Sequence, residues 1–454
     1  MTSSLPARHL RRGASAALLL LACVLLPGAL RAQDTVMVQL GLTYTPGSEP
    51  GFLVLPFAAA SGVEGAASAV RAVVRQDLDF SDRFRLQDAP SGQRPVAPAA
   101  LGGWRDRGAD WVLAGEVAPR AGGLTLRLAL LDGVYGQVKG DRVFDLPRAG
   151  DRGFRMAVHA AADEVVRWAV GEPGSAATRV AFVLQGRGSK EIYLVDWDGE
   201  NVQRVTSDGS IALSPAWSPD GSRLAYTSFR NGTPVLYERA LASGADRVVS
   251  DRNGINITPA YAPDGRTLAF GTTSAGNTEV ATWNRAQGCC LEVLTRGRRF
   301  DSLSPTFSPD GRRLAFVSNR LGEPHVYVMT PGQEPRLVSE YRYGSQGYNT
   351  SPDWSPRGEV IAYHTRVSGS PQIALVDAGG GRPRLLTNRG SNEDPSWAPD
   401  GRHLVFASDR EGGGLYVMDV VSGRTRPLLR GRGYGLPDWS PVLVRAPAAP
   451  AAGR

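Results

Sequence analysis

The N-terminal third of the chain changes its hydrophobic period several times, as a small mixed domain does. Residues 52–57 form the short apolar run of a buried strand, and residues 111–117 and 124–130 indicate two further strands. Two helical stripes complete the pattern, with Val70, Val73, Val74 and Leu78 in the first and Val158, Ala162, Val165, Val166 and Ala169 in the second. Residues 85–100 have no period and predict a loop. We therefore expect an N-terminal α/β domain over residues 33–172.

From residue 179 onward, one phrase recurs. Ser214–Tyr226, SPAWSPDGSRLAY, is its first full copy. Further copies lie at residues 258–270, 304–316, 351–363 and 394–406, and a truncated copy lies at 436–441. The second proline of each copy follows the previous one by 42 to 47 residues. A period in the forties that contains several short strands is the signature of a propeller blade.

Each part of the phrase has a physical role in a blade. Proline has no N–H to donate, so it belongs at the start or edge of a strand. The aromatic residue two positions later is large enough to fill the space between blades, and all six copies carry one: Trp217, Tyr261, Phe307, Trp354, Trp397 and Trp439. Ser-Pro-Asp-Gly is typical of a type I turn. Three more strands follow, so we expect each unit to be a four-stranded antiparallel blade.

The two ends of the array are incomplete in complementary ways. The array opens at residues 179–183 with a second strand that lacks the phrase before it, and it ends at residues 436–441 with a first strand that lacks a second. Together the fragments make one blade, so the C-terminal strand closes the ring and leaves no open sheet edge. The expected fold is α+β: the N-terminal α/β domain, a six-bladed β-propeller over residues 178–441, and a disordered tail over 442–454.

Residues 1–32 have the three parts of a secretory signal peptide. Basic residues extend to Arg12, an apolar run covers residues 14–26, and a cleavage site ends at Ala32. A lipoprotein signal with a lipidated Cys23 is the alternative, which is disfavoured because the apolar run continues past that residue. No other stretch has the ~18 apolar residues that a membrane span needs, so we expect a soluble exported protein.

Charge excludes two classes of partner. The formal charge is +7, but the first 32 residues supply +4 of it, and from Gln33 onward 47 basic side chains face 44 acidic ones. That balance is too even for a surface that binds nucleic acid or anionic lipid.

The sequence contains no recognisable catalytic motif. It lacks G-x-S-x-G, H-E-x-x-H, the phosphate-binding loop and C-x-x-C. Asp196–Asn201 resembles the start of a calcium loop, but a tight hairpin turn explains it better. Cys289 and Cys290 can close a disulfide between neighbours, although two thiols at a turn are the simpler interpretation. We therefore expect no enzyme, no cofactor and no metal.

What remains is a surface of loops. In such a propeller, the loops from the second to the third strand of a blade share one face with the loops that enter the next blade. We call the loops of this face the rim. The rim residues that we select as candidates for partner binding are Asn253, Asn256, Ser302, Leu303, Asn349, Asn392, Glu393, Arg230, Arg320 and Arg410. Polar loops with embedded apolar groups are typical of protein-binding surfaces. Solvated loops without a partner are the alternative.

The chain resembles the TolB family, the periplasmic component of the Tol-Pal cell-envelope system. Besides the propeller repeats, residues 104–117, 130–132 and 178–182 match the family in order and spacing. The Ser-Pro-Asp-Gly repeat alone is also found in tricorn-type and prolyl-oligopeptidase propellers, so the N-terminal domain makes the resemblance specific. One departure is Ala176 in the linker, where the family has an aromatic residue.

The resemblance implies a non-enzymatic periplasmic scaffold, expected to be a monomer that does not insert into the membrane. It implies that the rim binds the peptidoglycan-associated lipoprotein Pal and that a flexible segment, residues 33–45, binds the inner-membrane protein TolA. In that segment the positions that match the TolA-binding residues of the family are Asp34, Val36, Val38 and Leu40. The role implied is outer-membrane integrity and envelope constriction at cell division.

Two other functions stay open at this point. An exported propeller-bearing peptidase would need a catalytic domain, yet only 13 residues follow Pro441. A receptor for a small ligand would use the axial channel of the propeller, and a ligand would then raise the melting temperature by mass action.

Overall fold

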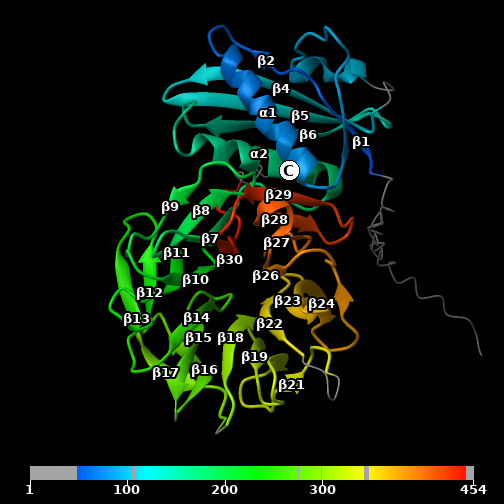
Figure 1. Cartoon of the computed structure of the whole chain (residues 1–454). Helices are drawn as coiled ribbons and strands as arrows, with labels where there is room; N and C mark the ends of the chain where they lie inside the picture. The colour runs from blue at the N-terminus through cyan, green and yellow to red at the C-terminus, as the bar shows by residue number, and fades with distance from the viewer. Residues whose placement is uncertain (1–48, 105–108, 275, 298, 342–346, 446–454) are drawn as a thin grey trace, which may run out of the picture. The chain divides into compact units, whose positions relative to one another are not determined.

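The computed structural model describes residues 49–104, 109–274, 276–297, 299–341 and 347–445 (Figure 1). The expected signal peptide, the segment with Asp34, Val36, Val38 and Leu40, and most of the expected tail lie outside the described residues. All described residues belong to one structural unit. Among their helices, none is long and apolar enough to cross a membrane.

The N-terminal domain is one sheet with both helices on the same face. Its strands are β1 Gly51–Val54, β2 Ala58–Ala59, β3 Arg85–Gln87, β4 Trp111–Arg120, β5 Gly123–Asp132 and β6 Gln137–Leu146, in the order β3-β1-β4-β5-β6 with β2 beside β4. Helices α1 Glu64–Phe80 and α2 Phe154–Val170 share one apolar core with the sheet, which includes Val74, Leu128 and Val165. A short 3-10 helix, η1 Pro98–Trp104, packs on the other face.

The helices and the hairpin confirm the hydrophobic pattern, but one segment differs. Residues 85–100 were expected to be loop, whereas β3 pairs in parallel with β1 through Gly51 and Arg85. Three residues are too few to produce a visible period, so only the neighbouring strand reveals this one.

The propeller has six blades, each a four-stranded sheet (Figure 1). Blade 1 is β10 Ala212–Trp217, β11 Arg223–Ser228, β12 Val235–Ala240 and β13 Asp246–Ser250, and blade 2 is β14 Asn256–Tyr261, β15 Thr267–Ser274, β16 Asn277–Asn284 and β17 Cys289–Val293. Blade 3 is β18 Ser302–Phe307, β19 Leu314–Ser318, β20 His325–Met329 and β21 Arg336–Leu337. Blade 4 is β22 Asn349–Trp354, β23 Val360–Val367, β24 Ser370–Asp377 and β25 Arg384–Leu385. Blade 5 is β26 Asn392–Trp397, β27 His403–Ser408, β28 Gly414–Asp419 and β29 Thr425–Arg430, with a short 3-10 helix, η2 Arg410–Gly412.

Blade 6 joins the two ends of the array, as the truncated repeats predict. Its order is β30 Tyr434–Trp439, β7 Arg179–Gln185, β8 Lys190–Asp196 and β9 Gln203–Arg204. The C-terminal β30 pairs antiparallel with β7. The backbone N–H of Arg179 also donates to the Ser440 hydroxyl at 2.8 Å. The ring is therefore closed by a non-covalent pairing of distant segments, and the predicted fold class is confirmed.

The repeated proline lies inside the innermost strand of each blade, at a bulge. The residue before it has a φ between 48 and 54° in all six blades: Ser214, Thr258, Ser304, Ser351, Asp394 and Leu436. Each of these strands also shifts register at that point. The bulge interrupts the ladder where proline has no N–H to donate. The aromatic residue that follows then packs between blades, as Trp354 does among the apolar residues of blades 3 and 4.

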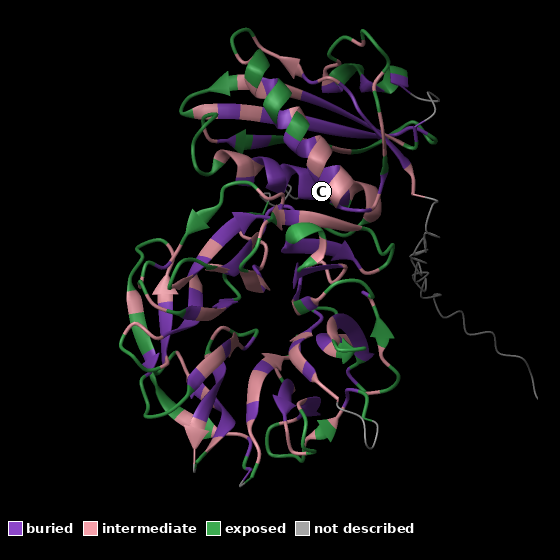
Figure 2. Cartoon of the chain, viewed as in Figure 1, coloured by how far each residue is buried: buried purple, intermediate pink, exposed green. Residues whose placement is uncertain are grey.

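Burial follows this plan across the chain. Figure 2 shows buried residues concentrated in the strands and exposed residues in the connecting loops. The axial cavity runs between the six innermost strands and has a volume of about 320 Å³.

The N-terminal domain contacts the propeller through the end of α1 and through α2. The Trp197 indole N–H donates to Asp77 at 2.9 Å, and the Arg426 guanidinium lies 3.8 Å from the centre of the Phe80 ring. The Asp82 carboxylate accepts from Arg424 at 3.0 Å. These propeller residues belong to, or adjoin, the turns between third and fourth strands of blades 5 and 6. In an antiparallel blade the rim loops lie at the opposite ends of the strands.

The linker between the domains is tied down by one carboxylate. Asp163 of α2 accepts hydrogen bonds from the backbone N–H groups of Ala176 at 2.7 Å and Ala177 at 2.9 Å. Burial raises the pKa of Asp163 to about 7. The small Ala176 side chain is buried in the core that blades 5 and 6 share.

Candidate partner-binding rim

Four of the ten predicted rim residues are buried. Asn256, Ser302, Asn349 and Asn392 each open an innermost strand, and each side chain is at most 2% exposed. Asn256 shows their role: its amide donates to the carbonyl groups of Pro234 at 3.1 Å and Arg252 at 2.7 Å. Such bonds fix the loops on either side. These four residues therefore brace the rim from within, whereas the sequence pattern placed them on its surface.

The other predicted residues do reach the surface. Asn253 and Glu393 are exposed, and Leu303 is half-buried. Partial burial raises the pKa of Glu393, with a further contribution from the nearby charges of Asp394 and Asp409. The exposed rim is therefore a mixture of polar, apolar and acidic groups.

The three predicted arginines share one geometry. Each guanidinium is stacked on an aromatic ring of its own blade: Arg230 lies 3.7 Å from the centre of Tyr237, Arg320 lies 4.7 Å from Tyr327, and Arg410 lies 5.3 Å from Tyr416. Stacking of this kind holds the cation in place while its N–H edge stays available for hydrogen bonds.

A fourth such arginine is not among the residues that the sequence pattern predicts. Arg366 of β23 lies 4.7 Å from the centre of the Tyr348 ring. Blade 4 lacks the aromatic-x-x-x-Arg spacing of Phe316 and Arg320 or of Phe406 and Arg410, because its arginine follows Tyr363 by three residues. That spacing occurs in blades 1, 3 and 5, at Arg230, Arg320 and Arg410, and therefore does not point to Arg366.

The axial channel is lined by the innermost strands of all six blades. Two partly buried carboxyl groups of this channel join neighbouring blades. Asp353 accepts from the backbone N–H of Trp397, and Asp438 accepts from that of Trp217, each at 2.7 Å. Burial raises the pKa of Asp353 to about 6, and burial together with the charge of Asp353 raises that of Asp438 to about 8. Both carboxyl groups therefore already accept hydrogen bonds from a neighbouring blade.

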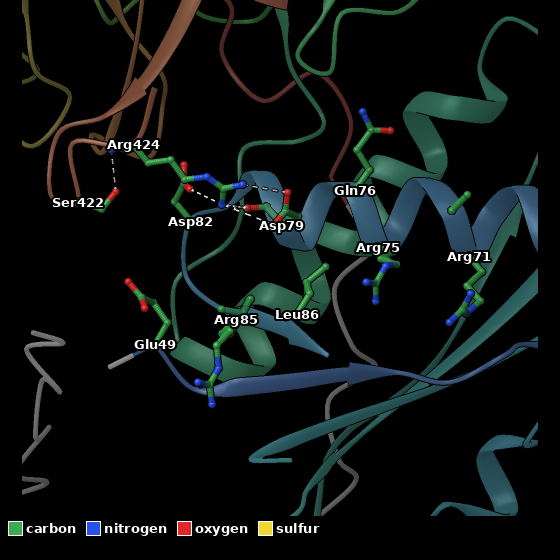
Figure 3. A pocket seen from close by; sticks show the side chains of 12 residues that line it. Glu49, Arg71, Arg75, Gln76, Asp79, Asp82, Arg85, Leu86, Ser422 and Arg424 are labelled. Atoms are coloured by element: carbon green, nitrogen blue, oxygen red, sulfur yellow. Dashed lines mark hydrogen bonds and ion pairs between the residues drawn. The ribbon is translucent and has the colours of Figure 1, made fainter. Parts of the chain in front are cut away.

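A cleft of about 930 Å³ lies between α1, β3 and the turn after β28 (Figure 3). Figure 3 shows Arg424 reaching across to Asp79 and Asp82, with which it forms ion pairs at 3.1 and 3.0 Å. Farther along α1, Arg71 donates to the carbonyl groups of Val54 and Leu55. The charged groups of this cleft are thus largely occupied in holding the fold.

One histidine lies between two carboxylates where the domains meet. His159 Nδ1 is 2.8 Å from Asp77, and its Nε2 is 3.4 Å from Asp198. Burial by itself lowers the pKa of His159, but the charge of Asp77 and then of Asp198 outweigh it and raise the pKa. Because the two carboxylates lie on opposite ring nitrogens, and Arg155 also binds Asp198 at 2.8 Å, the arrangement is an ion-pair network and does not form a cage for a metal.

The turn after β8 and the adjacent cysteines were also interpreted from the sequence. Asp196–Asn201 forms the turn between β8 and β9, with Gly199 at a φ of 91°, as the hairpin interpretation predicts. Cys289 and Cys290 are joined in a disulfide at the start of β17, so the expectation of two thiols was wrong. The left-handed backbone of Cys290, with a φ of 69°, is a conformation that the sequence does not signal.

The fold defines a β-propeller protein of the class that carries a small α/β domain before a closed six-bladed ring. Residues 168–443 match the family model described as the TolB beta propeller domain, and residues 48–138 match the TolB amino-terminal domain. The chain belongs to the TolB family, as its resemblance implies.

Relatives agree with this assignment. A Tol-Pal system protein TolB from Methylococcus capsulatus is 36% identical over 210 residues, which cover 45% of this chain and 48% of the relative. One from Albidiferax ferrireducens is 33% identical over 214 residues, which cover 45% and 49%. The chain thus spans about half the length of the curated relatives it matches. The crystal structure of TolB from Acinetobacter baumannii superposes with a TM-score of 0.75 at 25% identity and covers 87% of this chain and 98% of that one.

Proposed function

We propose that the protein is a periplasmic, non-enzymatic scaffold of the Tol-Pal system that binds a Pal-type lipoprotein through the propeller rim. The observation that carries the proposal is the rim itself: stacked arginines and exposed loop residues on loops braced from within, in a chain of the TolB family. Rigid loops lose little entropy on binding, which favours a preformed protein-binding surface.

The second partner in this proposal is a TolA-type inner-membrane protein, bound by residues 33–45. Residues 1–32 serve as the signal peptide, cleaved near Ala32, and the mature protein is a monomer in the periplasm. Contact with both partners would link the two membranes and the peptidoglycan. The scaffold would thereby maintain outer-membrane integrity and envelope constriction at cell division.

The test is a calorimetric titration of residues 33–454 with the soluble domain of the Pal-type lipoprotein from the same organism. Saturable one-to-one binding is expected. Replacing exposed rim groups, by Asn253→Ala and Leu303→Ala, should weaken it, since rim contacts are lost without loss of a loop brace. The control is Arg312→Ala, an exposed residue in a turn at the opposite end of blade 3. Absence of binding by the unaltered protein would refute the proposed function, and equal weakening by Arg312→Ala would refute the assignment of the face.

A further inference from the structure

The four stacked arginines of the rim differ in what neutralises them. Arg230 of blade 1 forms ion pairs with Asp246 at 2.9 Å and Asp208 at 3.4 Å. For Arg320, Arg366 and Arg410, no carboxylate among the described residues lies within ion-pairing distance. The neighbouring residues outside the described ranges, 298 and 342–346, contain no aspartate or glutamate.

These three arginines lie at the same end of the second strand in three consecutive blades. Arg320 follows β19 in blade 3, Arg366 lies near the end of β23 in blade 4, and Arg410 follows β27 in blade 5. We call them the arginine arc. Since each lies where the second strand of its blade meets the rim, they follow one another around the ring.

The guanidinium groups of the arc are oriented, but no carboxylate among the described residues contacts them; the charges of Glu279 and Glu334 act on Arg320 only from a longer distance, as that of Glu393 does on Arg366. The Arg320 Nε donates to the Ser318 hydroxyl at 3.3 Å, and Arg410 donates to the Asn392 side-chain oxygen at 2.9 Å. These acceptors are neutral. Burial lowers the pKa of Arg320, as expected for a partly desolvated cation without an anionic partner at contact distance.

We propose that the arginine arc is the part of the rim that receives the carboxylates of an acidic segment of a protein partner. This rests on the proposed function and adds the chemistry of the contact. A planar guanidinium held on an aromatic face presents a fork of N–H donors that matches a carboxylate in a bidentate pair. Arg230 is excluded from this role because its own acids already occupy it.

A protein segment fits the arc better than a lipid surface or a nucleic acid does. The exposed acidic residues Glu323, Glu393 and Asp409 lie on or beside the same loops and would repel the continuous negative charge of a lipid surface or a nucleic acid, whereas a flexible segment can place single carboxylates on the arginines away from them. Aromatic rings that accompany the arc, such as Phe300 beside Arg320 at 4.8 Å, are typical of the centre of protein interfaces.

The test uses residues 33–454 with two titrants, the soluble Pal-type domain and a decaglutamate peptide. The variants are Arg366→Gln alone and the triple change of Arg320, Arg366 and Arg410 to Gln. The matched control is Arg313→Gln, because Arg313 is also stacked, 4.8 Å from the Trp354 ring centre, but at the opposite end of blade 3. We expect the triple variant to bind both titrants about tenfold or more weakly. Between ~50 and ~300 mM salt, the affinity of the unaltered protein should fall, whereas the affinity of the triple variant should change much less.

Each outcome separates this inference from the proposed function. Pal-type binding that is unchanged in the triple variant, with no binding of the peptide, overturns the inference and leaves the scaffold function standing. Arginine-dependent binding of the peptide without binding of the Pal-type domain supports the inference and refutes the function. Arginine-dependent binding to phosphatidylglycerol vesicles, with no binding of either titrant, overturns both. Should the triple variant fail to fold, the exposed Arg366→Gln variant decides, with a smaller weakening expected and an unchanged affinity overturning the inference.

Discussion

The ion pairs of His403 make the stability of the protein depend on pH in a predictable direction. Its imidazole is buried where the propeller meets the N-terminal domain, with Nδ1 2.6 Å from Asp400 and Nε2 3.3 Å from Asp82. Burial by itself lowers the pKa of His403, but the two carboxylates outweigh it and raise the pKa to about 9. The ring is therefore charged at neutral pH.

The magnitude follows from the difference between the folded and unfolded pKa. At about 1.4 kcal/mol for each pH unit, the interval from 6.5 to about 9 is worth roughly 3.5 kcal/mol of unfolding free energy. Because the folded pKa is the higher one, this stabilisation is fully present below pH 6.5 and is lost as the pH rises through about 9. The lowered pKa of Asp400 reflects the same ion pair, so it adds nothing further.

The assay is urea unfolding of residues 33–454 at intervals from about pH 6 to about pH 9.5. Replacing His403 by Gln should remove the contribution of this residue, so that the variant is less stable than the unaltered protein at pH 6 and the gap narrows toward pH 9. The control is His325→Gln, because burial lowers the pKa of His325, the opposite direction to the shift of His403. A gap that stays constant with pH for His403→Gln, or narrows equally for His325→Gln, would refute the reasoning.

Three further predictions concern the core and the channel. The raised pKa of Asp438 makes the folded state less favourable as the pH rises from 3.8 to about 8. Asp438→Asn should therefore increase the melting temperature, and scanning calorimetry should show an increase at pH 9 that exceeds the increase at pH 5 by about 2 °C or more. Trp439→Ala, in the strand that closes the ring, should cost about 3–5 kcal/mol in urea unfolding, and a cost below 1 kcal/mol would contradict its place in the core. Gly414→Ala would place a Cβ 2.1 Å from a backbone oxygen of the adjacent strand and should lower the melting temperature by several degrees, whereas Gly102→Ala, with nothing within 4 Å, should leave it nearly unchanged.

The sequence by itself determined the architecture, because the features that specify it are local and repeated. A proline, an aromatic residue and a Ser-Pro-Asp-Gly turn recur at fixed spacing, and each can be recognised within about twelve residues of chain. The complementary fragments at residues 179–183 and 436–441 revealed even the closure of the ring. Helical and strand periods likewise outlined the N-terminal domain, apart from β3.

Only the tertiary structure decided which rim residues face solvent and which charges are left without a partner. Asn256 is buried because carbonyl groups on two loops of blade 1 converge on it, and Arg230 differs from Arg320 because Asp208, in the loop after β9, and Asp246, in β13, reach it. Asp82 and His403 form an ion pair although they lie 321 positions apart in the chain. Burial and electrostatic pairing depend on groups that folding brings together over such separations, so no local pattern in the chain can express them.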